Sequence, residues 1–263
     1  MPPHIIRISS QKGGVGKTTI AVNLSVSLQK LGYETLLIDS DTGNPSVGFH
    51  IGLEKANIGY KDFVTGKMEL NEVAVPHAPS GMHVVPGLVN VRPFELNERD
   101  ERNAILRLKK SRYQFIVIDT EIGCNGITEG IDEALILTTP SMPSCSSVIR
   151  MAKEFDQMQL SHNLAINRVQ NRRYEISESE IAEMYERKTI ASIPEDDIVP
   201  ESIEEKIPAV LLKPKNRFTR SISALARHYA MGTGAEPESP GKAGKLSFLE
   251  KISRIINMLR SKS

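Results

Sequence analysis

Residues 11–19 read Gln-Lys-Gly-Gly-Val-Gly-Lys-Thr-Thr, and their types and spacing suit the binding of phosphate. Glycines at positions 13, 14 and 16 let the backbone turn its N–H groups inward around an anion. A helix that begins near Lys17 adds its positive N-terminal dipole. Lys17 is placed to contact the terminal phosphates of a nucleotide, and the Thr18 hydroxyl is placed to bind Mg²⁺. The segment therefore predicts a nucleotide-binding loop.

Two positions in this loop differ from the common pattern G-x-x-x-x-G-K-[ST]. Gln11 occupies the place of the first glycine, and Lys12 adds a second lysine before the glycines. One lysine is sufficient to hold the phosphates of one nucleotide, so Lys12 requires a different explanation. The three remaining glycines still allow the backbone to surround a phosphate.

Carboxylates that could help to bind Mg²⁺ stand at the ends of two apolar runs. Asp119 ends the run Phe-Ile-Val-Ile-Asp, and Asp39 and Asp41 end the run Leu-Leu-Ile-Asp-Ser-Asp. Mg²⁺ prefers oxygen ligands and keeps much of its hydration, so such carboxylates act on it directly or through water. We expect these side chains to lie beside the phosphates of the nucleotide.

The loop and the carboxylates must be positioned by regular elements, which the apolar pattern predicts. Strands are predicted at 4–9, 34–40, 82–87, 113–120, 133–139, 163–169 and 189–195. Helices are predicted at 17–31, 97–110, 144–159, 177–187 and 215–230. This alternation favours an α/β fold with a doubly wound, mostly parallel sheet. The phosphate loop follows the first strand, at the sheet edge where such folds bind ligands.

The composition is that of an ordinary globular protein. The chain has 263 residues and a formal net charge of +1, so nucleic-acid or membrane binding must be sought in local charge. Cys124 and Cys145 lack metal-site or disulfide-scaffold spacing and are expected to be free thiols. No apolar run approaches the length of a membrane-spanning helix, and the N-terminus lacks a signal-peptide pattern. A cytoplasmic location is expected.

The character of the sequence changes after Met231, which divides the chain into three predicted parts. Residues 1–231 form the nucleotide-binding domain, 232–245 a Gly/Pro/Ala/Ser-rich flexible linker, and 246–263 a basic amphipathic helix. From Lys242 to the end, six basic residues and one glutamate give a local charge of +5. The helix side chains predicted to bind a membrane are Phe248, Leu249, Ile252, Ile255, Ile256, Leu259, Lys251 and Arg254.

A basic amphipathic helix on a tether is typical of an interfacial membrane anchor. Its apolar stripe must be covered, and the alternative is that it packs on the domain or against a helix of another protein. Basic residues favour an anionic membrane surface by roughly 1 kcal/mol each. Two weak anchors held in one dimer would bind much more strongly than one.

The segment Lys12–Thr19 resembles the deviant Walker A signature of the MinD/ParA family of ATPases, and the chain looks most like the MinD type. The resemblance extends over residues 4–231. It includes Asp39-Ser40-Asp41, the stretch Asp119–Gly123, Ala165–Arg168 and Ile193–Asp196. It implies a P-loop NTPase fold, ATP and Mg²⁺ as cofactors, and slow, dimer-dependent hydrolysis of ATP to ADP.

The resemblance also implies a role for particular residues. Lys12 would cross the interface of an ATP-bound homodimer, Asp41 would orient the attacking water, and both would be catalytic. The Mg²⁺ ligands would be Thr18, Asp41 and Asp119. The ATP-binding residues would be Gln11, Lys12, Gly13, Gly14, Val15, Gly16, Lys17, Thr18 and Thr19, with Asn167 and Pro194 at the adenine.

One segment departs from the family pattern. Relatives carry D-x-P-x-G after the Walker B strand, whereas this chain reads Asp-Thr-Glu-Ile-Gly at 119–123. Glu121 therefore places a negative charge in the second switch, which in the family responds to the γ-phosphate. Gln11 is a milder departure because many relatives have glutamine there.

The leading functional hypothesis is an ATP-dependent dimerising switch. It would associate reversibly with the inner face of the cell membrane and recruit a protein activator or cargo, for cell division or positioning of surface machinery. An alternative is a ParA-like partition ATPase that binds DNA non-specifically through basic segments such as 168–173 and 211–220. A third is a cluster carrier or ligase of the same superfamily. The two isolated cysteines disfavour the carrier, and the absence of recognisable substrate-specific residues disfavours the ligase.

Overall fold

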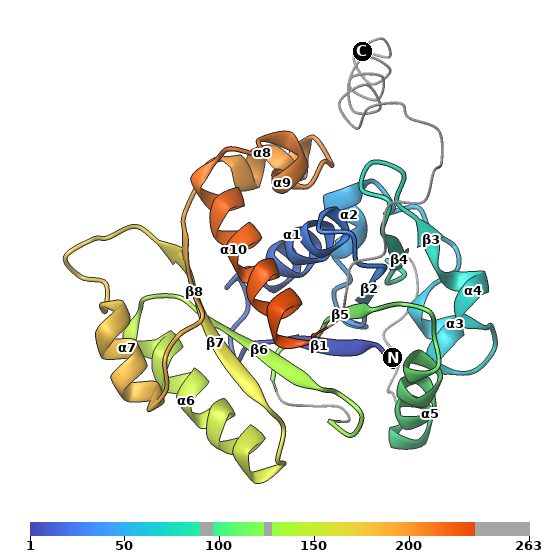
Figure 1. The fold of residues 1–263 in the computed structure, drawn as a ribbon, viewed down its shortest axis with the longest axis horizontal. Helices are drawn as coiled ribbons and strands as arrows, with labels where there is room; N and C mark the ends of the chain where they lie inside the picture. Colours follow the sequence, from blue (N-terminus) through green and yellow to red (C-terminus); the bar gives the residue numbers. More distant parts are fainter. Residues whose placement is uncertain (90–96, 124–127, 235–263) are drawn as a thin grey trace.

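One sheet of eight strands forms the centre of the molecule (Figure 1). The computed structural model describes residues 1–89, 97–123 and 128–234. The strands are β1 (His4–Ser9), β2 (Thr35–Asp39), β3 (Val75–Pro76), β4 (His83–Val85), β5 (Phe115–Asp119), β6 (Glu133–Thr138), β7 (His162–Val169) and β8 (Ala191–Pro194). Their order is β3-β4-β2-β5-β1-β6-β7-β8, and only the pairing of β3 with β4 is antiparallel.

Helices cover both faces of the sheet (Figure 1). One face packs against α1 (Lys17–Lys30), α2 (Val47–Ile51), α8 (Ile198–Glu204), α9 (Ala209–Leu212) and α10 (Arg217–Gly232). The other packs against α3 (Tyr60–Val64), α4 (Leu70–Val73), α5 (Glu98–Lys109), α6 (Met142–Gln157) and α7 (Glu178–Tyr185). This is the doubly wound arrangement predicted from the sequence, and the fold class is confirmed.

The central strands are mainly apolar, and helices cover both of their faces. Every residue of β2 and β5 is buried, including the two aspartates that end them. A strand buried on both faces loses the polar alternation of a surface strand, which explains the continuous apolar runs in the sequence. Apolar burial of this kind stabilises the fold by about 25 cal/mol per Å².

Local signals set several helix boundaries. The Asn97 side chain accepts a hydrogen bond of 2.8 Å from the backbone N–H of Asp100 at the start of α5. Ser177 and Glu180 form a reciprocal capping box at the start of α7. Such caps satisfy N–H groups that have no partner within the helix, and each contributes about 1 kcal/mol.

All seven predicted strands and five predicted helices are present, most of them slightly shorter than predicted. The sequence did not predict β3 or the short helices α2, α3, α4, α8 and α9. These elements have two to seven residues. Elements of that length contain too few turns or alternations to produce a recognisable periodicity.

The predicted C-terminal anchor lies outside the described residues. Helix α10 extends to Gly232, and the structure describes the chain as far as residue 234. All of 246–263 and most of the predicted linker are therefore not covered. Among the described residues, every helix is too short or too polar to cross a lipid bilayer.

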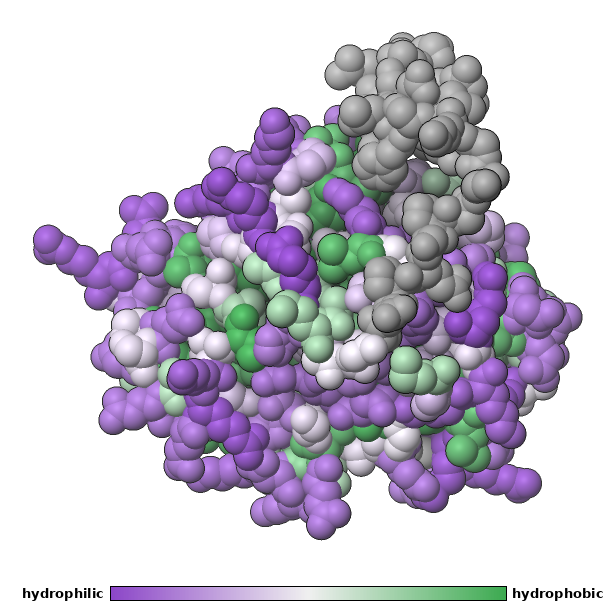
Figure 2. Space-filling view, viewed as in Figure 1, coloured by the Kyte–Doolittle hydropathy of each residue, from purple (hydrophilic) through white to green (hydrophobic). Residues whose placement is uncertain are grey.

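Figure 2 shows mainly hydrophilic side chains on one face of the molecule, with apolar side chains in small scattered groups. Scattered groups of this kind are normal for a protein surface. Of the two cysteines, Cys145 is a buried free thiol, as predicted, and Cys124 lies outside the described residues.

Candidate functional site

The loop between β1 and α1 requires glycine at two positions. Gly14 and Gly16 have φ values of 75° and 98°, in the left-handed region that favours glycine. A Cβ atom on Gly16 would also lie 2.4 Å from Nδ2 of Asn167. That Nδ2 donates a hydrogen bond of 2.8 Å to the carbonyl of Val15. The Asn167 amide thus fixes the shape of the loop and leaves no room for a side chain at Gly16.

The first helical turn meets the end of β5 at Thr18. The Thr18 hydroxyl donates a hydrogen bond of 2.6 Å to Oδ2 of Asp119, which is 1% exposed. The other carboxylate oxygen of Asp119 is buried and has no hydrogen-bond partner within the described ranges. Burial, together with the nearby charge of Asp41, raises the pKa of Asp119 to about 7, although Thr18 and Lys17 oppose the shift. A buried carboxylate with an unused oxygen fits a cation site.

Asp39 holds the end of the loop that leads from β2 into α2. It pairs with Asp119 across β2 and β5 and is 1% exposed. Its Oδ2 accepts hydrogen bonds of 2.9 Å from the backbone N–H groups of Ser46 and Val47. Burial, and then the charge of Asp119, holds the pKa of Asp39 well above its usual range. Asp39 therefore shapes the turn into α2.

Asp41 lies in the loop that follows β2. Its Oδ1 accepts a hydrogen bond of 2.7 Å from the backbone N–H of Asn44. The charge of Asp41 contributes to the raised pKa of Asp119, so the two carboxylates lie in the same region. No direct hydrogen bond joins Asp41 to Thr18 or Asp119 in the described part of the chain.

The loop after β5 is tied to both of its neighbours. Glu121 Oε1 accepts hydrogen bonds from the backbone N–H and the hydroxyl of Thr42, at 3.0 and 2.6 Å. Gly123, with φ of 105°, donates its N–H to the carbonyl of Ser10 at 2.8 Å. The loop after β2 and the start of the phosphate loop are therefore both linked to the segment that follows Asp119.

Two exposed side chains stand over the phosphate loop. A Cβ atom on Gly13 would lie 3.3 Å from Cδ1 of Ile122, which is 49% exposed. The side chain of Lys12 is also exposed, while the Ser10 hydroxyl donates a hydrogen bond of 2.9 Å to its carbonyl. This surface lies next to the site and exposes the Lys12 cation to an approaching molecule.

A nucleotide-binding family matches the segment that contains this site. The model of the CobQ/CobB/MinD/ParA nucleotide-binding domain matches residues 6–209. The chain belongs to this family.

Three relatives illustrate the similarity. An uncharacterised ATP-binding protein of Methanocaldococcus jannaschii is 28% identical over 252 residues, which are 94% of each chain. The septum site-determining protein MinD of Pyrococcus horikoshii, solved with Mg-ADP, has a TM-score of 0.81 and 26% identity, covering 88% of this chain and 98% of that one. MinD in the MinC:MinD complex of Aquifex aeolicus has a TM-score of 0.77 and 25% identity, covering 90% and 98%.

The MinD/ParA resemblance and the nucleotide-binding fold are thus confirmed. The predicted pair of cofactors, ATP and Mg²⁺, is supported at the level of the family, because the domain is a nucleotide-binding one and Mg-ADP accompanies the Pyrococcus protein. The predicted residues of the phosphate loop form the turn after β1, residues 11–16, and the start of α1, residues 17–19, where Thr18 contacts Asp119. Their individual roles remain predictions.

The predicted adenine-side residues come together at the ends of two adjacent strands. Asn167 is in β7 and Pro194 ends β8, where Val169 pairs with Pro194. Asn167 is buried and its amide contacts the phosphate loop. The family-derived role at the base is a proposal, and the contact to Val15 is an additional structural one.

Three residues of the MinD/ParA site were missed by sequence reasoning. Ser46 Oγ lies 2.7 Å from Thr18 Oγ1, Thr42 contacts Glu121, and His50 lies 3.3 Å from Thr19. All three belong to the loop after Asp41 and to α2, which the sequence did not predict. The available signal was the run of small polar residues that follows Asp39.

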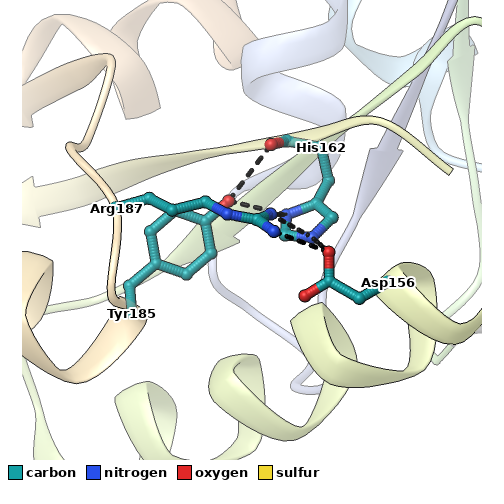
Figure 3. A network of polar contacts seen from close by, with 4 residues as sticks. All are labelled: Asp156, His162, Tyr185 and Arg187. Carbon is teal, nitrogen blue, oxygen red and sulfur yellow. Dashed lines mark hydrogen bonds and ion pairs between the residues drawn. The ribbon is translucent and has the colours of Figure 1, made fainter. Parts of the chain in front are cut away.

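A second polar cluster contains Asp156, His162, Tyr185 and Arg187 (Figure 3). It lies at the amino end of β7, away from the carboxyl ends of the strands. His162 begins β7, and its Nδ1 lies 2.7 Å from the hydroxyl of Tyr185. Arg187 lies 2.7 Å from Nε2 of His162 and donates a hydrogen bond of 2.7 Å to Asp156. Burial lowers the pKa of His162. The phosphate loop follows the carboxyl end of a parallel strand, so this cluster is not part of the nucleotide site.

Proposed function

We propose that this chain is an ATPase that hydrolyses ATP to ADP and acts as a dimerising switch. The observation that carries the proposal is the contact of Thr18 with the buried Asp119 behind a phosphate loop that exposes a second lysine, Lys12. A nucleotide loop alone needs one lysine. A second cation on the surface is suited to the phosphates held by another subunit, as an arginine finger is.

The residues around Thr18 fit Mg²⁺. Among the described residues, no group of three or more His, Cys, Asp or Glu side chains could hold a metal ion alone, so this site depends on hydroxyl and phosphate oxygens. Thr18 would bind the ion directly, and Asp119 and Asp41 would act directly or through water. The ion, when bound, neutralises charge on the phosphate oxygens.

The other side chains bind and orient the nucleotide. Lys17 lies close enough to Asp119 for its charge to affect that pKa, and it would contact the terminal phosphates. Asp41 would orient the attacking water, and Asn167 and Pro194 would surround the adenine. Phosphoryl transfer depends on such positioning and on the stabilisation of spread negative charge.

Hydrolysis would require two subunits. Lys12 would reach the nucleotide of the other subunit, so each complete site would contain residues from both copies. The rate per molecule would then rise with protein concentration. This dependence suits a switch, because assembly and hydrolysis are linked.

We propose that residues 1–231 form the ATPase domain, that 232–245 form a linker and that 246–263 form the membrane-binding helix. Support comes from the sequence pattern of that helix, with its apolar stripe and local charge of +5. Dimerisation would join two weak anchors and increase their binding through avidity. The ATP form would therefore associate with the inner membrane surface and recruit a protein activator or cargo.

The test is the ATPase rate as a function of protein concentration, with and without anionic liposomes. We expect the rate per molecule to rise with both. Sedimentation with the same liposomes should require ATP and not ADP, and a chain truncated at Gly232 should remain in solution. A truncated chain that sediments equally well would refute the anchor, and a rate independent of concentration would refute the shared site.

A ParA-like DNA-binding function is the second candidate. Arg172 and Arg173 are exposed after β7, beside Tyr174, which is 81% exposed. Such a group could contact phosphates and stack on a base. ATP-dependent binding to duplex DNA that weakens steeply with salt would favour this function, and its absence would leave the membrane switch.

A further inference from the structure

The hydroxyl of Ser46 does not cap the helix that follows it. Ser46 is the N-cap residue of α2, where a serine side chain usually accepts a hydrogen bond from the first helical turn. Here the side chain makes no such bond. Its Oγ lies 2.7 Å from Thr18 Oγ1 instead. The hydroxyl is therefore directed to the nucleotide site.

The oxygens around Thr18 have the spacing of metal ligands. Thr18 Oγ1 is 2.7 Å from Ser46 Oγ and 2.6 Å from Asp119 Oδ2. Adjacent ligands of an octahedral Mg²⁺ with bonds of about 2.1 Å lie roughly 3 Å apart. Two hydroxyl groups already near that separation can turn their lone pairs toward one ion with little movement.

The backbone of Ser46 is fixed independently of its hydroxyl. Its N–H donates a hydrogen bond of 2.9 Å to Asp39, and its carbonyl lies 3.0 Å from Nδ1 of His50. His50 Nε2 in turn lies 3.3 Å from the Thr19 hydroxyl. A neutral imidazole satisfies both contacts, because Nδ1 donates and Nε2 accepts. Only the Ser46 hydroxyl is left to change partner.

We propose that Ser46 is a second hydroxyl ligand of the Mg²⁺ that accompanies the nucleotide, beside Thr18. The inference rests on the proposed function, because it concerns the same nucleotide site. It adds a direct link between the ion and α2. Because Asp39 and His50 hold the backbone of Ser46, binding of the ion would be transmitted to the loop that carries Asp41.

The test measures the metal affinity of variants that lack the Ser46 hydroxyl, with both hard and soft metal ions. Ser46→Ala should lower the affinity for Mn²⁺, titrated by electron paramagnetic resonance with ADP present, by about tenfold or more. ADP binding in EDTA should stay at the wild-type level. Ser46→Cys should lose affinity for Mg²⁺ but recover it for Cd²⁺, because a thiolate prefers a softer ion.

Matched controls separate ligation from a change in structure. Ser221→Cys, on α10, introduces a thiol away from the site, where the wild-type hydroxyl contacts only the Arg217 carbonyl at 3.3 Å. It should show neither the loss with Mg²⁺ nor the gain with Cd²⁺. Thermal unfolding without metal should show that Ser46→Ala and Ser46→Cys remain folded and lose no more than the contribution of one hydrogen bond, about 1 kcal/mol. Ser46→Thr, which keeps a hydroxyl, should retain Mn²⁺ affinity.

The possible outcomes are distinct. Wild-type metal affinity in Ser46→Ala would overturn the assignment, while ATP-dependent dimerisation of the wild type would leave the proposed function intact. Loss of affinity in Ser46→Cys without recovery by Cd²⁺ would mean that Ser46 acts only through Thr18, which also overturns direct ligation. Failure of the wild type to bind a metal–nucleotide complex would overturn both.

Discussion

Glu121 accepts two hydrogen bonds from Thr42, one from its backbone N–H and one from its hydroxyl. The two residues belong to different loops, which follow β5 and β2 at the carboxyl edge of the sheet. In the sequence, Glu121 is an unexpected charge beside the phosphates. In the structure its carboxylate joins the two loops, so they are expected to move as a unit.

The first prediction concerns this link. Glu121→Ala and Thr42→Val should each lower the free energy of unfolding of the nucleotide-free protein, because each removes the hydroxyl–carboxylate bond. A double-mutant cycle measured by urea denaturation should give a coupling of about 1 kcal/mol. Strictly additive effects would mean that the hydroxyl–carboxylate contact contributes nothing to stability, and the bond from the Thr42 backbone N–H would be left as the link between the two loops.

The second prediction is that Lys17 and Lys12 have different roles, one in nucleotide binding and the other in dimerisation. Lys17→Ala should abolish nucleotide binding, because Lys17 would contact the phosphates held by its own subunit. Lys12→Ala should bind a fluorescent ATP analogue with nearly wild-type affinity, because the Lys12 side chain is exposed and would serve the other subunit. The same variant should neither dimerise in light scattering nor hydrolyse ATP. Normal hydrolysis by Lys12→Ala would disprove the shared site.

The third prediction tests the two left-handed glycines against each other. Gly14→Ala adds a side chain where no atom lies within 4 Å, so only backbone strain of roughly 1–2 kcal/mol is expected. Gly16→Ala suffers the same strain and also meets Asn167 at 2.4 Å. It should be the more destabilised variant in thermal unfolding and should lose ADP affinity.

A second substitution can separate the steric collision from the backbone strain in Gly16→Ala. Gly16→Ala combined with Asn167→Ala removes the colliding amide and should recover part of the lost stability relative to Gly16→Ala alone. The backbone strain should remain. If the double variant is no more stable than Gly16→Ala, the collision is not the cause.

The fourth prediction is a pH dependence that originates in the cluster of Figure 3. Burial lowers the pKa of His162, although Asp156 and Glu133 act in the opposite direction and Arg187 reinforces the shift. Between the folded pKa and about 6.5, the unfolded chain binds a proton that the folded chain does not. Stability must therefore fall as pH decreases through that interval, and it is unaffected above it.

Comparison with His162→Gln isolates this contribution from the other titrating groups. The wild type should lose more thermal stability than the variant between pH 7 and pH 5, and the difference should vanish above pH 7. Equal losses in the two proteins would show that His162 is not titrating in this range. The neighbouring Tyr185 hydroxyl, which bonds to the His162 carbonyl, is kept in both.

The sequence predicted those features that are encoded by short segments. The phosphate loop is nine consecutive residues, and each central strand is one apolar run. The sequence did not predict the individual contacts between distant segments. Thr18 and Asp119 are 101 residues apart, and Thr42 and Glu121 are 79 apart. The position of Asp119 at the end of a strand and the MinD/ParA resemblance both suggested that it lies near Thr18, but no pattern indicated the direct hydrogen bond between them.

Ser46 illustrates why the rest of the site could not be predicted. A serine before a short apolar stretch predicts an N-cap, and Ser46 does occupy that position. Its side chain nevertheless turns away from the helix, because Asp39 holds the backbone in place and Thr18 offers a partner. Tertiary contacts thus overrode a local preference, and no pattern in the loop records them.

The prolines of the two outermost strands limit how copies of this chain can associate. β3 ends in Pro76 and β8 ends in Pro194. Proline has no backbone N–H to donate, and short edge strands that contain it resist the addition of another strand. Growth of the sheet from copy to copy, the usual route to aggregation, is therefore disfavoured at both ends. The proposed dimer would instead use the surface beyond the strand ends, where Lys12 and Ile122 are exposed.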